Sequence, residues 1–210
     1  QRDARLASES LWQAAELFDK AGSRDNAARV YTQYARQYPE PFERNLEARW
    51  RLVQGLRAGS QTPGTAARET ALLREIRDTE QRAGAARTDR TRTIGGLAAL
   101  ALTQPLLDDY RKVALVEPLA RQLKLKKTKM EAALQAYGQA SASAAPEVVT
   151  AATFHTAALY QDFGKAMLQS QRPKGLNKIA LEQYDVLLEE QAFPFEEKAT
   201  ELHEANARRA

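Results

Sequence analysis

Five basic side chains within nine residues are the strongest charge feature of the chain. They are Arg121, Lys124, Lys126, Lys127 and Lys129, and no acidic residue interrupts them. Such a group attracts an anionic partner, which could be nucleic acid, an anionic lipid or an acidic protein surface. No aromatic side chain is interleaved with the bases, so the stacking platform for single-stranded nucleic acid is missing. The stretch is a candidate electrostatic contact surface, and a solvated helix face is the alternative.

A segment of opposite charge lies later in the chain. Residues 182–204 carry eight acidic side chains and a single Lys or Arg, Lys198. Attraction between the acidic segment and the basic stretch is therefore a hypothesis, either within one chain or between two chains.

No pattern of residues predicts a catalytic, metal or cofactor site. The two histidines, His155 and His203, fall in different expected helices, and no second ligand accompanies His155 on its face. Gly95 and Gly96 lack the further residues of a phosphate-binding loop. Three carboxylate pairs are adjacent in sequence, so on a helix their members diverge by about 100°: Asp108/Asp109, Glu189/Glu190 and Glu196/Glu197. We expect a non-enzymatic protein; a buried polar cluster around His155 would favour an enzyme instead.

The composition predicts helices throughout. Among 210 residues there are 39 Ala but only seven Val and three Ile, which favours helix over strand. Charged residues make up 28% and hydrophobic residues 43%, as in globular proteins. The net charge of +4 is a weak basic signal. The chain has no cysteine, and no apolar run approaches the roughly 20 residues of a membrane span.

Prolines separate stretches with helical periodicity, which predicts about eight or nine helices with antiparallel neighbours. They stand at positions 39, 41, 63, 105, 118, 146, 173 and 194. A kink or break is expected at Pro105, and the segment 139–145 is left open as helix end or loop. The last two helices are expected over 179–191 and 195–208, joined at Phe193 and Pro194. Six aromatic residues at helical spacing are expected in the core: Trp12, Trp50, Tyr31, Tyr34, Phe154 and Phe163.

Residues 13–39, together with Leu11 just before them, resemble a tetratricopeptide repeat. The matching residues are Leu11 and Ala15 in the large and small positions, Phe18 in the aromatic position, Gly22 at the turn, Ala27, Tyr31 and Tyr34 in the second helix, and the terminal Pro39. Leu11 replaces the usual Trp, with Trp12 beside it. A second repeat, over 42–77, matches loosely because its turn is too long.

This resemblance implies a helical superhelix with a concave binding surface. We expect one all-helical fragment of a larger protein, with tetratricopeptide-like hairpins over 1–84 and longer, less regular helices over 85–210. The function that it implies is a protein-binding scaffold without a cofactor. The alternative is binding of nucleic acid or an anionic surface through residues 121–129, although nucleic acid is the less expected partner.

Residues 181–198, LEQYDVLLEEQAFPFEEK, are similar to the last part of large bacterial tetratricopeptide proteins of TonB systems. That resemblance implies a location in the periplasm or cell envelope, with components of the TonB system as partners. Composition alone leaves the cytoplasm open.

Overall fold

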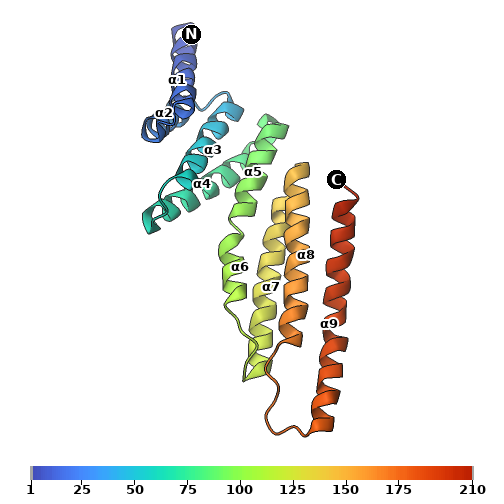
Figure 1. The fold of residues 1–210 in the computed structure, drawn as a ribbon. Coiled ribbons are helices and arrows are strands. Elements are labelled where there is room, and N and C mark those ends of the chain that lie inside the picture. Colours follow the sequence, from blue (N-terminus) through green and yellow to red (C-terminus); the bar gives the residue numbers. More distant parts are fainter. Residues whose placement is uncertain (1, 210) are drawn as a thin grey trace. The chain divides into compact units, whose positions relative to one another are not determined.

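The computed structural model describes residues 2–209, and within them the fold is all-α, as the composition predicts (Figure 1). The helices are α1 (Arg2–Lys20), α2 (Arg24–Gln37), α3 (Phe42–Ala58), α4 (Pro63–Arg82), α5 (Asp89–Ala101), α6 (Gln104–Arg111), α7 (Leu119–Ser141), α8 (Pro146–Leu168) and α9 (Lys178–Ala207), with one 3₁₀ turn over Gly84–Ala86. Among these described residues, no helix is long and apolar enough to cross a membrane.

Several helix boundaries follow directly from local sequence signals. Gly22 separates α1 from α2 with a φ of 69°, a left-handed conformation that glycine adopts without strain. Thr62 caps α4 through a reciprocal pair of hydrogen bonds with Thr65, and Pro63 is the first helical residue. Pro146 likewise opens α8, as its position in the sequence predicts.

Two prolines have different effects on the chain. Near Pro105 the helix breaks: α5 ends at Ala101, and Pro105 lies in the first turn of α6, where its missing N–H costs nothing. The helix pair expected around Pro194 is wrong, because α9 continues through this residue. Ala192 and Ala199, on either side of Pro194, are both buried. Packing on both sides of the proline offsets the one backbone hydrogen bond that it removes.

The chain divides into two compact units, Gln1–Leu102 and Thr103–Ala210. In unit 1 the first core cluster lies among α1, α2 and α3. The Trp12 ring meets Tyr31 and Tyr34 edge to face, with centroids 5.7 and 5.2 Å apart. Trp12 is buried, whereas its neighbour Leu11 only packs against this cluster. Trp12, and not Leu11, is therefore the large side chain that α1 buries in this cluster.

A second cluster in unit 1 joins α3, α4 and α5. Its buried residues are Leu46, Trp50, Val53, Leu73, Ile76, Ile94 and Ala98. Gly95 lets α5 approach α4 closely, since a Cβ atom there would lie 2.8 Å from Cγ of Glu80. Gly95 thus serves helix packing, and both Gly95 and Gly96 are buried.

In unit 2, α7, α8 and α9 lie side by side, and α6 packs on α7 (Figure 1). Small side chains let these long helices approach closely: Ala133, Ala140, Ala152, Ala157, Ala192 and Ala199 are all buried. The open segment 139–145 divides into the end of α7 and a short loop. Phe163 is in the core, but the core position expected for Phe154 is wrong, because its side chain is 50% exposed.

Candidate functional site

The basic stretch of α7 does not present all five bases to solvent. Lys126 is buried, and its ammonium group donates to the backbone carbonyls of Tyr110 and Val113 at 3.2 and 2.9 Å. The same group lies 4.0 Å from the centroid of the Tyr110 ring. Burial lowers the pKa of Lys126. Lys126 thus satisfies carbonyls at the end of α6 and is removed from any contact surface.

The other four bases lie in two kinds of environment. Lys129 is half-buried and pairs with Asp109 at 3.4 Å. Lys112, and then Lys129, lower the pKa of the Asp109 carboxyl group. Arg121, Lys124 and Lys127 are exposed. Within residues 2–209, no ion pair joins the basic stretch to the acidic segment 182–204. The hypothesis that the two segments attract each other within one chain is therefore not supported by any ion pair among these residues.

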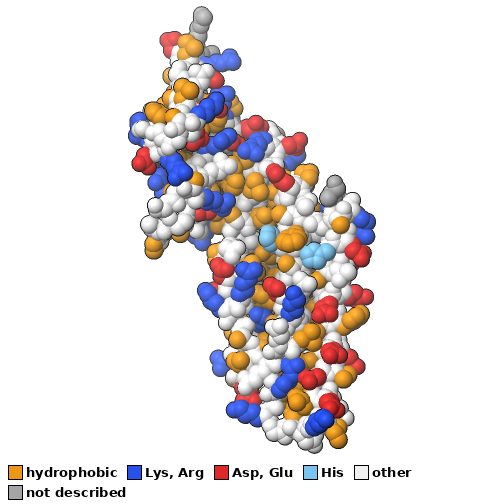
Figure 2. Space-filling model, in the orientation of Figure 1, with side chains coloured by type: hydrophobic (Ala, Val, Ile, Leu, Met, Phe, Trp, Pro, Cys, Tyr) orange, Lys and Arg blue, Asp and Glu red, His pale blue; other side chains and the backbone are white. Residues whose placement is uncertain are grey.

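The two histidines lie on either side of Phe154 in unit 2. The Phe154 ring is 5.6 Å from His155 and 5.6 Å from His203, which lies on α9 (Figure 2). His155 also stacks on Tyr137 of α7 at 5.6 Å. Partial burial, and then the charge of Arg111, lower the pKa of His155. Aromatic rings surround His155 here, and the described residues hold no metal-binding group of three His, Asp or Glu side chains.

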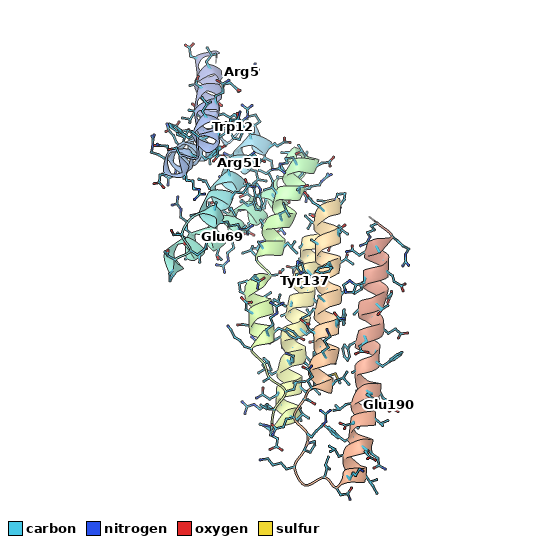
Figure 3. The ribbon with its side chains drawn as sticks, in the orientation of Figure 1. Arg5, Trp12, Arg51, Glu69, Tyr137 and Glu190 are labelled. Atoms are coloured by element: carbon cyan, nitrogen blue, oxygen red, sulfur yellow. The ribbon has the colours of Figure 1, made fainter. Side chains whose placement is uncertain are left out.

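A broad groove in unit 1 runs over α1, α3 and the start of α5, with a volume of about 870 Å³. Figure 3 shows Arg5 and Trp12 on α1 and Arg51 on α3. The groove is lined by Arg5, Ser8, Glu9, Trp12, Pro41, Glu43, Arg44, Glu47, Arg51 and Arg90. Helices α1, α3 and α5 thus contribute to one continuous surface, rich in charges of both signs.

Ion pairs connect the three helices beneath this groove. Arg44 on α3 binds Glu9 on α1 at 2.6 Å and lies over the Trp12 ring, 5.2 Å from its centroid. The hydrogen bond to Glu9 raises the pKa of Arg44. Glu47 accepts from Arg51 at 3.0 Å and from Arg90 of α5 at 2.8 Å. Because Arg44–Glu9 and Arg90–Glu47 cross between helices, they hold these groove side chains in place before any ligand arrives.

Arg5 differs from the other groove arginines. It is exposed, and within the described part of the chain it makes no ion pair. Its guanidinium is therefore available to a carboxylate on a ligand, whereas Arg44 and Arg90 are already engaged.

A smaller cavity of about 310 Å³ lies among α2, α3 and α4 in unit 1. Its lining combines apolar residues such as Leu52 and Leu56 with Arg24, Arg51 and Arg68. Tyr31 lines it too, and its hydroxyl donates to Asp19 at 3.0 Å. Burial, and then that bond to Asp19, raise the pKa of Tyr31. Asp19 and Asp25 offset much of the basic charge, so the cavity has no strong preference for anions.

Sequence reasoning pointed to α7 and missed the groove, because its residues are spread over positions 5 to 90. A signal for Lys126 did exist. Positions 126, 130, 133 and 137 share one helical face, and the last three hold the buried residues Met130, Ala133 and Tyr137.

Comparisons with known proteins give no relative for the chain. No family model matches it, no curated protein matches it, and no solved structure matches it.

Proposed function

We propose that the chain is a non-enzymatic protein-binding scaffold and that the groove over α1, α3 and α5 binds an extended segment of a partner. The observation that carries this proposal is the groove itself, whose lining comes from three helices, α1, α3 and α5, joined by the ion pairs Arg44–Glu9 and Arg90–Glu47. Stacked helical hairpins use such surfaces to bind proteins.

The charges of the groove favour a partner segment with polar and charged side chains. Glu9 and Glu47 are held by arginines, so a ligand does not have to order them. Arg5 offers an unengaged guanidinium that fits an acidic side chain. The segment that we propose is therefore extended and carries at least one Asp or Glu placed against Arg5.

The tetratricopeptide-like superhelix over the first half of the chain is part of this proposal. The match of Ala15, Gly22 and Tyr31 to the repeat supports it, as does the continuous lining by α1 and α3. An envelope location with partners from a TonB system is a further proposal, supported only by the resemblance of residues 181–198.

Binding of an anionic partner through residues 121–129 is less favoured. Lys126 is buried and Lys129 is paired with Asp109, so three exposed bases are left for such a contact. A surface of this size gives weak and strongly salt-dependent binding.

The groove can be tested with peptides selected for binding to the chain from a random library. Binding of a selected peptide is expected to fall at least about tenfold in Arg5→Glu, because the variant repels the acidic side chain. Arg74→Glu on α4 is the control, since Arg74 is exposed and is not among the groove's lining residues. Equal losses in both variants, or no loss in Arg5→Glu, would contradict the proposal.

The envelope proposal needs a separate test. Crosslinking in an envelope extract of the native cell, with the chain as bait, should recover a TonB-type energy-transducing protein, and Arg5→Glu should reduce its yield. Recovery of nucleic acid and ribosomal proteins, removed by moderate salt, would contradict the location and favour residues 121–129.

A further inference from the structure

Helix α9 has two apolar faces, and α8 covers only one of them. Ala192 and Ala199 are 1% and 3% exposed and form the buried face. On the opposite side Ile179, Val186 and Phe193 are 67%, 55% and 61% exposed. A spacing of seven residues keeps these three side chains on one side of the helix. We call them the outer stripe.

Large exposed side chains in such a row are unusual for a helix at the surface of a soluble domain. A surface helix has one apolar face and a polar face opposite to it. Leu187 is also 50% exposed, but as the next residue after Val186 it points about 100° away from the stripe. Large apolar side chains exposed in a row on one helix face are typical of an interaction site rather than of a solvated surface.

Glutamates lie along the outer stripe, between and beside its apolar residues. Glu182 follows Ile179 by three positions, Glu189 and Glu190 follow Val186 by three and four, and Glu197 follows Phe193 by four. Side chains three and four apart are neighbours on a helix. Figure 2 shows acidic and hydrophobic side chains together over α9, and Figure 3 labels Glu190 there.

These four glutamates have no cationic partner in the described part of the chain. The ion pairs of α9 involve Asp185, Glu201 and Glu204 instead. In paired helices, charges beside an apolar seam select a partner helix of opposite charge. The stripe and its flanks together thus specify the pattern that a partner must carry.

We propose that the outer face of α9 binds an amphipathic helix of a partner protein, with apolar residues at every seventh position and Lys or Arg beside them. A second copy of this chain fits less well. Its basic helix α7 offers only Leu125 as a large apolar side chain exposed among its bases, so it would leave most of the stripe uncovered. The surface lies in unit 2 and is independent of the groove in unit 1, so either proposal can fail without the other.

The direct test uses a synthetic helical peptide of three heptads, with Leu at one position of each heptad and Lys three and four positions later. Fluorescence anisotropy with the full 210-residue chain is expected to give micromolar binding that weakens with salt. The double variant Val186→Gln plus Phe193→Gln should bind at least about tenfold more weakly, because it loses apolar burial while the charge stays constant. Leu125→Gln, on the exposed face of α7, is the matched control and should bind like the wild type.

A charge reversal tests the flanks. Glu189→Lys plus Glu190→Lys should weaken binding of the lysine peptide and strengthen binding of the same peptide with Glu in place of Lys. Unchanged binding of the lysine peptide to the Gln double variant would overturn the proposal, because the peptide would then be held by charge alone and not by the apolar stripe. Sedimentation that shows a dimer of the chain, lost in the Gln double variant, would assign the stripe to a second copy and would also overturn it.

Discussion

Among the described residues, each unit buries one Lys, Arg, Asp or Glu side chain, but the two charges are satisfied differently. In unit 1, Glu80 is 3% exposed and receives two hydrogen bonds from Arg87, at 2.5 and 3.1 Å. In unit 2, Lys126 is 5% exposed and has only neutral partners within hydrogen-bonding distance, two carbonyl oxygens, together with the face of a ring. A directly bound countercharge offsets desolvation in the first case. In the second case carbonyl dipoles do so, together with the charge of Asp162, which forms no ion pair with Lys126 among the described residues. The two sites should therefore respond differently to mutation and to pH.

The largest effect is expected where a buried charge loses its countercharge. Arg87→Ala leaves the Glu80 carboxylate buried without its cation and should lower the free energy of unfolding by about 3 kcal/mol. Urea denaturation measures this change. Arg92→Ala is the control, because Arg92 pairs with the fully exposed Asp89 and its loss should change stability little.

A double variant sharpens the comparison further. Glu80→Met combined with Arg87→Met removes both charges and should recover most of the stability lost in Arg87→Ala. If the double variant is no more stable than Arg87→Ala, the loss comes from packing and not from the unpaired carboxylate.

The next effect distinguishes two adjacent lysines of the basic stretch. Lys126→Ala removes the donor to the carbonyls of Tyr110 and Val113 and should cost about 2 kcal/mol in urea denaturation. Lys127→Ala, at an exposed position on the same helix, should change stability by less than about 0.5 kcal/mol. Equal effects in the two variants would mean that Lys126 is a surface residue after all.

The difference between Lys126 and Lys127 also shows which features the sequence could predict and which it could not. Gly22, Thr62 and Pro146 set helix boundaries through their own backbone chemistry, so those boundaries were predictable. The burial of Lys126 depends on carbonyls at the end of another helix. A count of charges along the chain carries no information about such a contact.

The errors at Phe154 and Pro194 have a similar origin. Phe154 is an aromatic residue of the kind that a core usually buries. However, it does not lie on the face of α8 that buries Ala152 and Leu159. At Pro194 a local rule predicts a break, and packing of Ala192 and Ala199 overrides it. The groove was beyond sequence reasoning for a third reason, since only tertiary contacts such as Arg44–Glu9 bring its helices together.

The contribution of Lys126 to the free energy of unfolding should depend on pH. Its pKa is lowered in the folded state, so between that lowered value and the usual lysine pKa of about 10.4 the unfolded chain binds more protons. Stability from this group therefore rises with pH as the pH approaches 10. As the pH rises towards 10, the stability of the wild type, measured as its free energy of unfolding, should therefore increase relative to that of Lys126→Met. A constant difference would show that burial does not perturb the lysine.

The smallest effect compares two buried tyrosines, one in each unit. The Tyr110 hydroxyl of unit 2 is buried and has no hydrogen-bond partner within residues 2–209, whereas Tyr31 of unit 1 donates to Asp19. Tyr110→Phe removes an unsatisfied polar group and keeps the ring beside Lys126, so stability should stay the same or rise by up to about 1 kcal/mol. Tyr31→Phe should instead lose about 1 kcal/mol, because it removes a hydrogen bond. Thermal and urea unfolding of both variants measure whether each substitution raises or lowers the stability. A loss in Tyr110→Phe as large as that in Tyr31→Phe would mean that the Tyr110 hydroxyl has a partner, such as a buried water, and that Lys126 sits in a wetter site than its lowered pKa indicates.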